Sequence, residues 1–158
     1  MAATPLSAYY PLFRGSQWVY NVVDDGKRRT DTETIALQTK RMHGQQVYQR
    51  VIDSSDGERG FNYENLSGSG QIQFHGMGDN SLSLIFSPPI VFPKLARVGQ
   101  RTEMDGKLDA IEESVRMRGT YHAEVRVVGT EKVRVAAGTF NCLKVQMTMD
   151  FSFKYGNF

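Results

Sequence analysis

The side chains most able to do chemistry in this chain are scattered along it. The histidines are His43, His75 and His122, and no two of them have the spacing of a helical zinc motif. Cys142 is the only cysteine, so this chain alone forms neither an internal disulfide nor a cysteine-based zinc site. We therefore expect no metal site.

Neighbouring carboxylates occur at Asp24 and Asp25 and at Glu112 and Glu113. Adjacent side chains in an extended strand point to opposite faces, so neither pair can act as acid and base on one substrate. The serine- and glycine-rich residues 67–70 lack the lysine and the helix of a phosphate-binding loop. We expect no catalytic residues and no cofactor. A non-enzymatic protein is favoured, although a catalytic site whose residues are distant in the sequence and meet only in the folded protein stays open.

Composition indicates an ordinary soluble globular protein. The 158 residues suit one domain, with 40% hydrophobic and 23% charged residues. The formal net charge of +2 is too small to indicate a polyanionic partner, so we expect no nucleic acid. Apolar runs are too short for a membrane-spanning helix, so we expect no transmembrane segment.

Alternation of apolar and polar residues is the clearest structural signal. It extends over residues 115–127 and again over residues 143–153, which predicts two long strands with one dry and one wet face. Gly119 is the expected place for a bulge. Between the two strands, Val133 and Val135 predict a short inward-facing strand with turns at residues 128–130 and 137–139.

The N-terminal half predicts further strands at residues 18–23, 32–39, 46–52, 57–63 and 71–74. Residues 24–27 and 43–44 are typical turns, and a short helix within residues 1–13 stays open. We predict one β domain over residues 1–158. Its fold class is all-β, with a single strongly curved antiparallel sheet that forms an open half-barrel or partial barrel with meander connections.

Residues 82–93, which begin at Leu82 and end at Pro93, are apolar and contain three prolines. We call them the proline-rich segment. Proline lacks the amide donor of a central strand, so this segment is expected to be a linker that plugs one end of the barrel. The alternative is an exposed apolar lip for a ligand or partner.

Three stretches resemble a group of uncharacterised bacterial exported proteins and lipoproteins. Residues 9–20 are similar to the group's "YYPLxxGxxWxY" opening, and Pro88-Pro89 with residues 93–99 are similar to its middle segment. Residues 133–145 match its "VxVxAGTFxCLKV" motif. The resemblance implies an extracytoplasmic address and a curved sheet like the half-barrels of lipoprotein carriers, but no activity.

Relatives in that group continue into a further C-terminal strand, so the last strand here is expected to lack a neighbour. The resemblance places the protein in the periplasm or at the outer membrane of a bacterium, with an export signal removed; a cytoplasmic location stays open. In the motifs, Phe140 and Leu143 are expected to anchor a hairpin to the core, Cys142 to pack as a small hydrophobe and Trp18 to lie in the core.

Two hypotheses follow for function. The first is an extracytoplasmic binding module for an apolar ligand such as a lipid or acyl chain; its candidate residues are Tyr121, Met147, Met149, Phe151, Phe86, Ile90 and Phe92. Alternatively, these side chains simply fill the core. The second is a structural or interaction protein of the cell envelope that contacts a partner protein through the proline-rich segment or an exposed edge strand, which includes a homodimer.

Overall fold

The structure is a computed structural model that describes residues 4–10, 12–135 and 138–153. Its elements are a short 3-10 helix and nine strands: η1 (Leu6–Tyr9), β1 (Gln17–Asp24), β2 (Lys27–Met42), β3 (Gln45–Ser54), β4 (Arg59–Leu66), β5 (Ile72–Asp79), β6 (Leu82–Val91), β7 (Arg101–Glu112), β8 (Val115–Val135) and β9 (Gly138–Phe153). Within the described ranges, no helix is long and apolar enough to cross a membrane.

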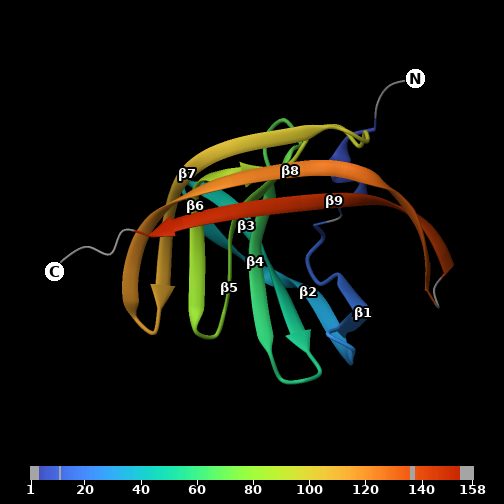
Figure 1. Ribbon diagram of the computed structural model, residues 1–158, viewed down its shortest axis with the longest axis horizontal. Helices are drawn as coiled ribbons and strands as arrows, with labels where there is room; N and C mark the ends of the chain where they lie inside the picture. The colour runs from blue at the N-terminus through green and yellow to red at the C-terminus, as the bar shows by residue number, and fades with distance from the viewer. Residues whose placement is uncertain (1–3, 11, 136–137, 154–158) are drawn as a thin grey trace.

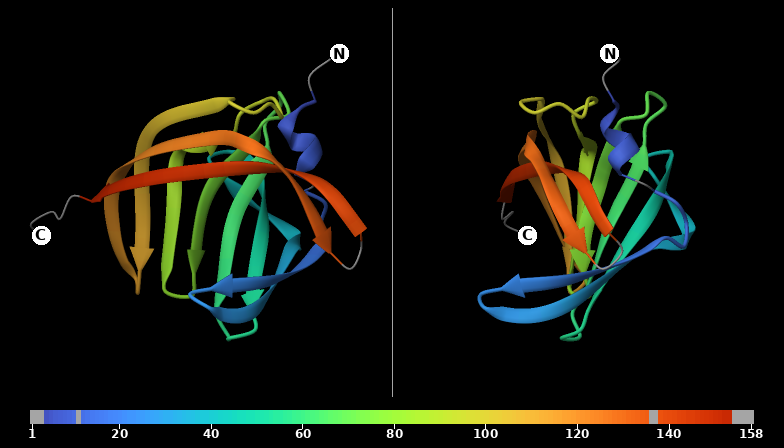
Figure 2. Two further views of the ribbon diagram at one scale, coloured as in Figure 1. Left: turned by 45° about the vertical axis from the view of Figure 1, so that its right-hand side comes forward. Right: turned by 90° about the vertical axis from the view of Figure 1, so that its right-hand side faces the viewer.

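The strands form one antiparallel sheet in which their order follows the chain from β1 to β9 (Figure 1). The sheet curls into a half-barrel, and Figure 2 shows the wide opening between the β1–β2 hairpin and the β8–β9 hairpin. The predicted fold class is therefore confirmed. Each connection is local, so the topology is a meander.

Tight turns set the register of several hairpins. Asp25 (φ 46°) and Gly26 (φ 77°) connect β1 to β2, and His43 (φ 48°) and Gly44 (φ 77°) connect β2 to β3. Two residues of positive φ match the right-handed twist of the paired strands, and glycine adopts this conformation readily. The turns predicted at residues 24–27 and 43–44 are confirmed.

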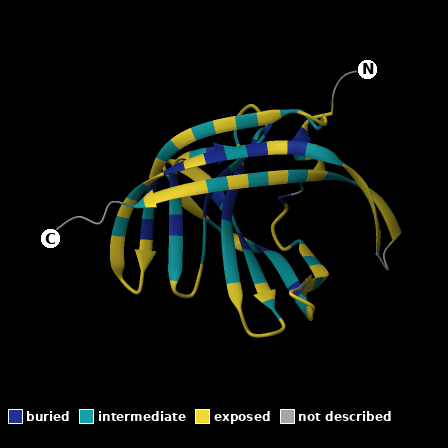
Figure 3. Cartoon of the chain, viewed as in Figure 1, coloured by how far each residue is buried: buried dark blue, intermediate teal, exposed yellow. Residues whose placement is uncertain are grey.

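The main core lies on the concave face of the sheet. Its buried residues are Phe74, Leu84, Phe86, Ile90, Leu108, Ala110, Tyr121, Ala123 and Val125. Phe86 is central, with its ring centroid 5.2 Å from that of Tyr121 and 5.7 Å from that of Phe74. Burial alternates along β8, as the sequence pattern predicts (Figure 3).

A bulge in β8 overturns two expectations. Val127 pairs with Val145 and Gly129 with Lys144, so residues 128–130 belong to a continuous strand and not to a turn. The extra residue shifts the alternation, which places Val133 on the face opposite to that of Val127. Gly119 keeps its regular partner Phe153, so the bulge predicted there is wrong. The turn predicted at residues 137–139 falls partly on residues 136–137, outside the described residues.

Gly119 is instead a site of close approach between β8 and β9. A Cβ atom at this position would meet the carbonyl oxygen of Ser152 and the ring of Phe153, whereas a Cβ at Gly129 would meet no atom within 4 Å. We expect Gly119→Ala to lower the free energy of unfolding by about 1–3 kcal/mol. The matched variant Gly129→Ala should change it by less than about 0.5 kcal/mol. Equal urea midpoints for the two variants would contradict this packing.

The expectation for the proline-rich segment is wrong, because most of it forms β6 in the middle of the sheet. The pairing with β5 changes from Gly76–Ile85 to Phe74–Ile90, so four residues of β6 bulge out opposite His75. Pro88 and Pro89 lie in this bulge, and the pairing of β6 with β7 ends at Ser87. Proline is tolerated here because neither neighbour needs its amide.

The N-terminal segment packs at one end of the half-barrel (Figure 2). The Leu6 amide donates to the Lys94 carbonyl at 2.9 Å, and the Ala96 amide donates to the Thr4 carbonyl at 3.0 Å. Leu6 then packs in a second buried cluster with Ile72 and Val127. Pro11, part of the opening motif, lies outside the described residues.

Candidate functional site

A large open cavity separates β1 from the first half of β9, and η1 borders it. Its volume is about 1610 Å³, above the roughly 300–1,000 Å³ of ordinary small-molecule pockets. Most of the lining is aromatic or aliphatic. The lining residues are Leu6, Tyr9, Tyr10, Trp18, Val19, Tyr20, Asn21, Ile72, Phe92, Val133, Arg134, Phe140, Asn141, Cys142, Leu143 and Val145. We call this space the edge cavity.

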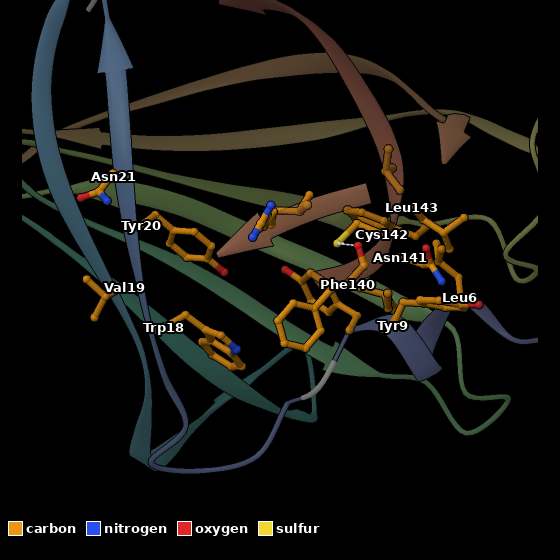
Figure 4. Close-up of a pocket in the computed structure, with 16 residues that line it drawn as sticks. Leu6, Tyr9, Trp18, Val19, Tyr20, Asn21, Phe140, Asn141, Cys142 and Leu143 are labelled. Atoms are coloured by element: carbon orange, nitrogen blue, oxygen red, sulfur yellow. Dashed lines mark hydrogen bonds between the residues drawn. The ribbon is translucent and has the colours of Figure 1, made fainter. Parts of the chain in front are cut away.

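The two edge strands face each other across the edge cavity (Figure 4). Trp18 and Tyr20 project from β1 towards Phe140 and Cys142 of β9. Trp18 is only partly buried and Phe140 is 50% exposed, so the expectations that they lie in the core or anchor a hairpin to it are wrong. The end of the cavity near Leu6 is more enclosed, because Leu143 and Val145 pack there against the second buried cluster.

A network of buried charged side chains lies behind the rings of Tyr10 and Trp18, which we call the aromatic wall of the cavity. The Arg50 guanidinium bonds Glu33 at 2.8 Å and Glu64 at 3.2 Å, and the Tyr10 hydroxyl donates to the other oxygen of Glu64 at 2.7 Å. Arg50 is 7% exposed and Glu64 2%. We call Tyr10, Glu33, Arg50 and Glu64 the buried charge cluster. Arg50 satisfies both carboxylates, which makes their burial possible.

Aromatic rings separate Arg50 from the cavity. Its guanidinium carbon lies 4.7 Å from the centroid of the Tyr10 ring and 5.3 Å from that of Trp18, which are cation–π distances. Burial lowers the pKa of Arg50, but Glu64 and the other acidic partners raise it by more, so it stays charged. Burial and the negative charge of Glu64 raise the pKa of Tyr10, which keeps its proton for Glu64.

The polar part of the lining consists of hydroxyl, amide, indole and guanidinium groups, all of which can donate hydrogen bonds. Of the described residues that line the cavity, only Arg134 has a charged side chain, and none has a carboxylate. Burial first, and the nearby Glu33 second, raise the pKa of Tyr20, so its hydroxyl stays protonated. Cys142 is partly buried at the cavity wall. The described lining therefore combines a mostly apolar surface with a few polar groups.

The residues that the sequence suggested for ligand binding lie mostly elsewhere. Phe86, Ile90 and Tyr121 are buried in the main core, and Met147 and Met149 pack against it while partly exposed. Phe151 is 39% exposed on the same strand, with its ring centroid 6.2 Å from that of Phe86. Of the seven, Phe92 lines the edge cavity.

Two of the three histidines lie side by side, and the third lies elsewhere. The ring of His43 stacks at 6.4 Å on that of His75, whereas His122 bonds Asp105 at 2.9 Å on an exposed part of β8. That hydrogen bond raises the pKa of His122. Within the part of the chain that the structure describes, no group of three or more His, Cys, Asp or Glu side chains could hold a metal ion.

His75 is fully buried in an amide cluster. Its Nε2 lies 3.1 Å from Asn65 Oδ1, while the Asn65 amide nitrogen donates to Gln45 and Gln46. The neutral ring therefore carries its proton on Nε2. Burial, followed by the neighbouring His43, lowers the pKa of His75 to about 4. His75 is thus a neutral structural side chain at physiological pH.

Sequence reasoning missed the buried charge cluster and the aromatic wall. Nothing in the sequence of β3 marks Arg50 as a buried residue, although it shares the concave face with Ile35, its partner on β2. A signal was present in the N-terminal residues, because Tyr9, Tyr10, Trp18 and Tyr20 concentrate aromatic side chains in one short stretch.

Comparisons of the chain with protein-family models, with curated proteins and with solved structures found no match.

Proposed function

We propose that the protein is a non-enzymatic binding module that holds an apolar or amphipathic ligand, such as a lipid or acyl chain, in the edge cavity. The observation that carries this proposal is the size and lining of the cavity: about 1610 Å³, bordered by aromatic and aliphatic side chains from η1, β1, β5 and β9. Pockets for small molecules are typically apolar with few polar groups. The motif resemblance favours a place in the bacterial cell envelope.

The opening between the edge strands supports ligand entry. β1 and β9 are the two ends of the strand order, so no strand of the described chain closes the barrel between them. A chain-like ligand can enter from the side and lie against Trp18 and Phe140 without unfolding the sheet. The second buried cluster, which includes Leu6 and Ile72, would contact its apolar end.

Native mass spectrometry of the protein incubated with dodecanol is a direct first test. We expect a one-to-one complex, and Phe140→Ser should weaken it about three- to tenfold because it removes an exposed apolar contact from the lining. The matched variant Phe151→Ser changes the same residue type on the same strand outside the cavity. It should leave the affinity unchanged.

Three outcomes would count against the proposal. Spectra that show only the free protein at every dodecanol concentration would remove it. If Phe151→Ser lowers the affinity for dodecanol and Phe140→Ser does not, the ligand binds instead at the β8–β9 face suggested by the sequence. Equal affinity for both variants and the unchanged protein would exclude Phe140 from the site.

A second candidate is an envelope interaction protein that pairs through β9. This edge strand is 16 residues long and contains only two charged residues, Lys144 and Asp150, which is little protection against strand addition. Light scattering should then report a dimer at high protein concentration, and a proline at Thr148 should abolish it. A strict monomer would remove this candidate.

A further inference from the structure

We infer that the ligand of the edge cavity carries an anionic head group, such as a carboxylate or a phosphate monoester, and that Arg134 binds it. This inference rests on the proposed function and specifies the chemistry of its ligand. It starts from the distribution of charge and polarity around the cavity and not from its volume.

Among the lining residues that the structure describes, Arg134 alone carries a formal charge. It pairs with Thr139 near the end of the β8–β9 hairpin, and the same face of the hairpin carries Asn141. The structure gives Arg134 no ion pair among the described residues. Its guanidinium is therefore available, with a planar set of donors that matches a carboxylate or a phosphate.

The remaining polar groups of the lining favour the same sign of ligand charge. Tyr20 offers a hydroxyl that stays protonated, and Asn141 offers an amide. Neither side chain bonds a carboxylate within the described part of the chain, and none of the described lining residues is acidic. A cationic head group would find no counter-charge in direct contact, whereas an anion would find donors.

The buried charge cluster does not reverse this preference. Its formal charge is −1, but Glu64 is bound by both Arg50 and Tyr10, and the side chain of Glu33 is only 25% exposed. Tyr10 and Trp18 stand between Arg50 and the cavity. The charge that a ligand touches is therefore that of Arg134.

The apolar and charged parts of the cavity are separate, which defines an orientation. Leu6, Ile72 and Val127 form the enclosed end, with Leu143 and Val145 against them. Arg134 lies beyond the bulge of β8, near the hairpin end. We infer that the acyl chain lies against the second buried cluster while the head group remains at Arg134, close to solvent.

Three ligands with the same chain and different head groups test the inference: dodecanoate, dodecanol and dodecyltrimethylammonium, each below its micelle concentration. Trp18 is the only tryptophan and lines the cavity, so its fluorescence reports occupancy. We expect dodecanoate to bind on the order of tenfold more tightly than dodecanol, the effect of one charge-assisted hydrogen bond near solvent. The cationic ligand should bind most weakly.

Arg134→Gln should remove the preference for dodecanoate over dodecanol. Arg126→Gln is the matched control, because Arg126 is exposed on the same strand and does not line the cavity. Equal affinities for dodecanoate and dodecanol in the unchanged protein, or a preference that survives Arg134→Gln, would overturn the inference while dodecanol binding upholds the proposed function. Failure of all three ligands to bind would overturn both.

Discussion

Replacing Arg50 with methionine is expected to lower the free energy of unfolding by about 3–5 kcal/mol, because the substitution removes the cation that pairs with the buried carboxylate of Glu64. Glu64, 2% exposed, loses both of its contacts to the guanidinium and keeps only the Tyr10 hydroxyl. The rings of Tyr10 and Trp18 also lose the cation against which they pack. Urea denaturation at neutral pH measures the loss.

Two controls separate this effect from a general cost of losing an arginine. Arg59→Met removes an exposed ion pair with Asp53 and should cost at most about 1 kcal/mol. The double variant Arg50→Met with Glu64→Leu removes both buried charges and should recover much of the stability. If Arg50→Met lowers the free energy of unfolding by no more than Arg59→Met does, the buried charge cluster is not buried as described.

The second large effect is a loss of folding stability at low pH. The pKa of His75 is about 4 in the folded protein, below the ordinary value of 6.5 that applies when the chain unfolds. Between these values the unfolded chain binds a proton that the folded protein does not, so stability is lost as the pH falls. From pH 7 to pH 4 we expect a loss of up to about 3 kcal/mol from this one group.

His75→Asn isolates this contribution. The variant should be less stable at pH 7, because the bond to Asn65 is disturbed, but its stability should fall less steeply from pH 6.5 to pH 4. His122→Asn is the control: it keeps His75, so its stability should fall between pH 6.5 and pH 4 at least as steeply as that of the unchanged protein, because hydrogen bonding to Asp105 raises the pKa of His122 and this histidine does not contribute to the acid-induced loss. Parallel pH profiles for His75→Asn and the unchanged protein would contradict a buried neutral His75.

The fold class could be predicted from the sequence because the β8–β9 ribbon alternates so regularly. The same rule failed wherever a strand contains an extra residue. In β2 the register shifts between Ile35 and Thr39, and Ile35 is fully buried while Leu37 is 72% exposed, although strict alternation would place both side chains on one face. A bulge depends on the neighbouring strand, and one chain's pattern does not contain that information.

Strand β7 was missed for a related reason. Its inward positions include Thr102, Gly106 and Ala110, which are small, so the contrast between its faces is weak in the sequence. Gly106 is small because a Cβ there would meet the Tyr121 ring and the Ser87 carbonyl oxygen. The need for a glycine at position 106 thus comes from residues that are distant in the sequence.

The candidate site was the least predictable part. The sequence shows apolar side chains, but it does not distinguish a filled core from an open cavity. The methionines and aromatic residues of β8 and β9 meet side chains from β5, β6 and β7 and fill the main core. The edge cavity depends on the distance in space between β1 and β9, which are the first and the last strand in the order of the sheet.

Quenching of Trp18 fluorescence by a brominated acyl chain tests the central claim most directly, because bromine quenches tryptophan only on contact. We expect saturable one-to-one quenching by a brominated fatty acid, relieved by an excess of the same chain without bromine. A brominated chain that binds with full stoichiometry and leaves Trp18 emission unchanged, or that does not bind, would contradict a ligand site in the edge cavity.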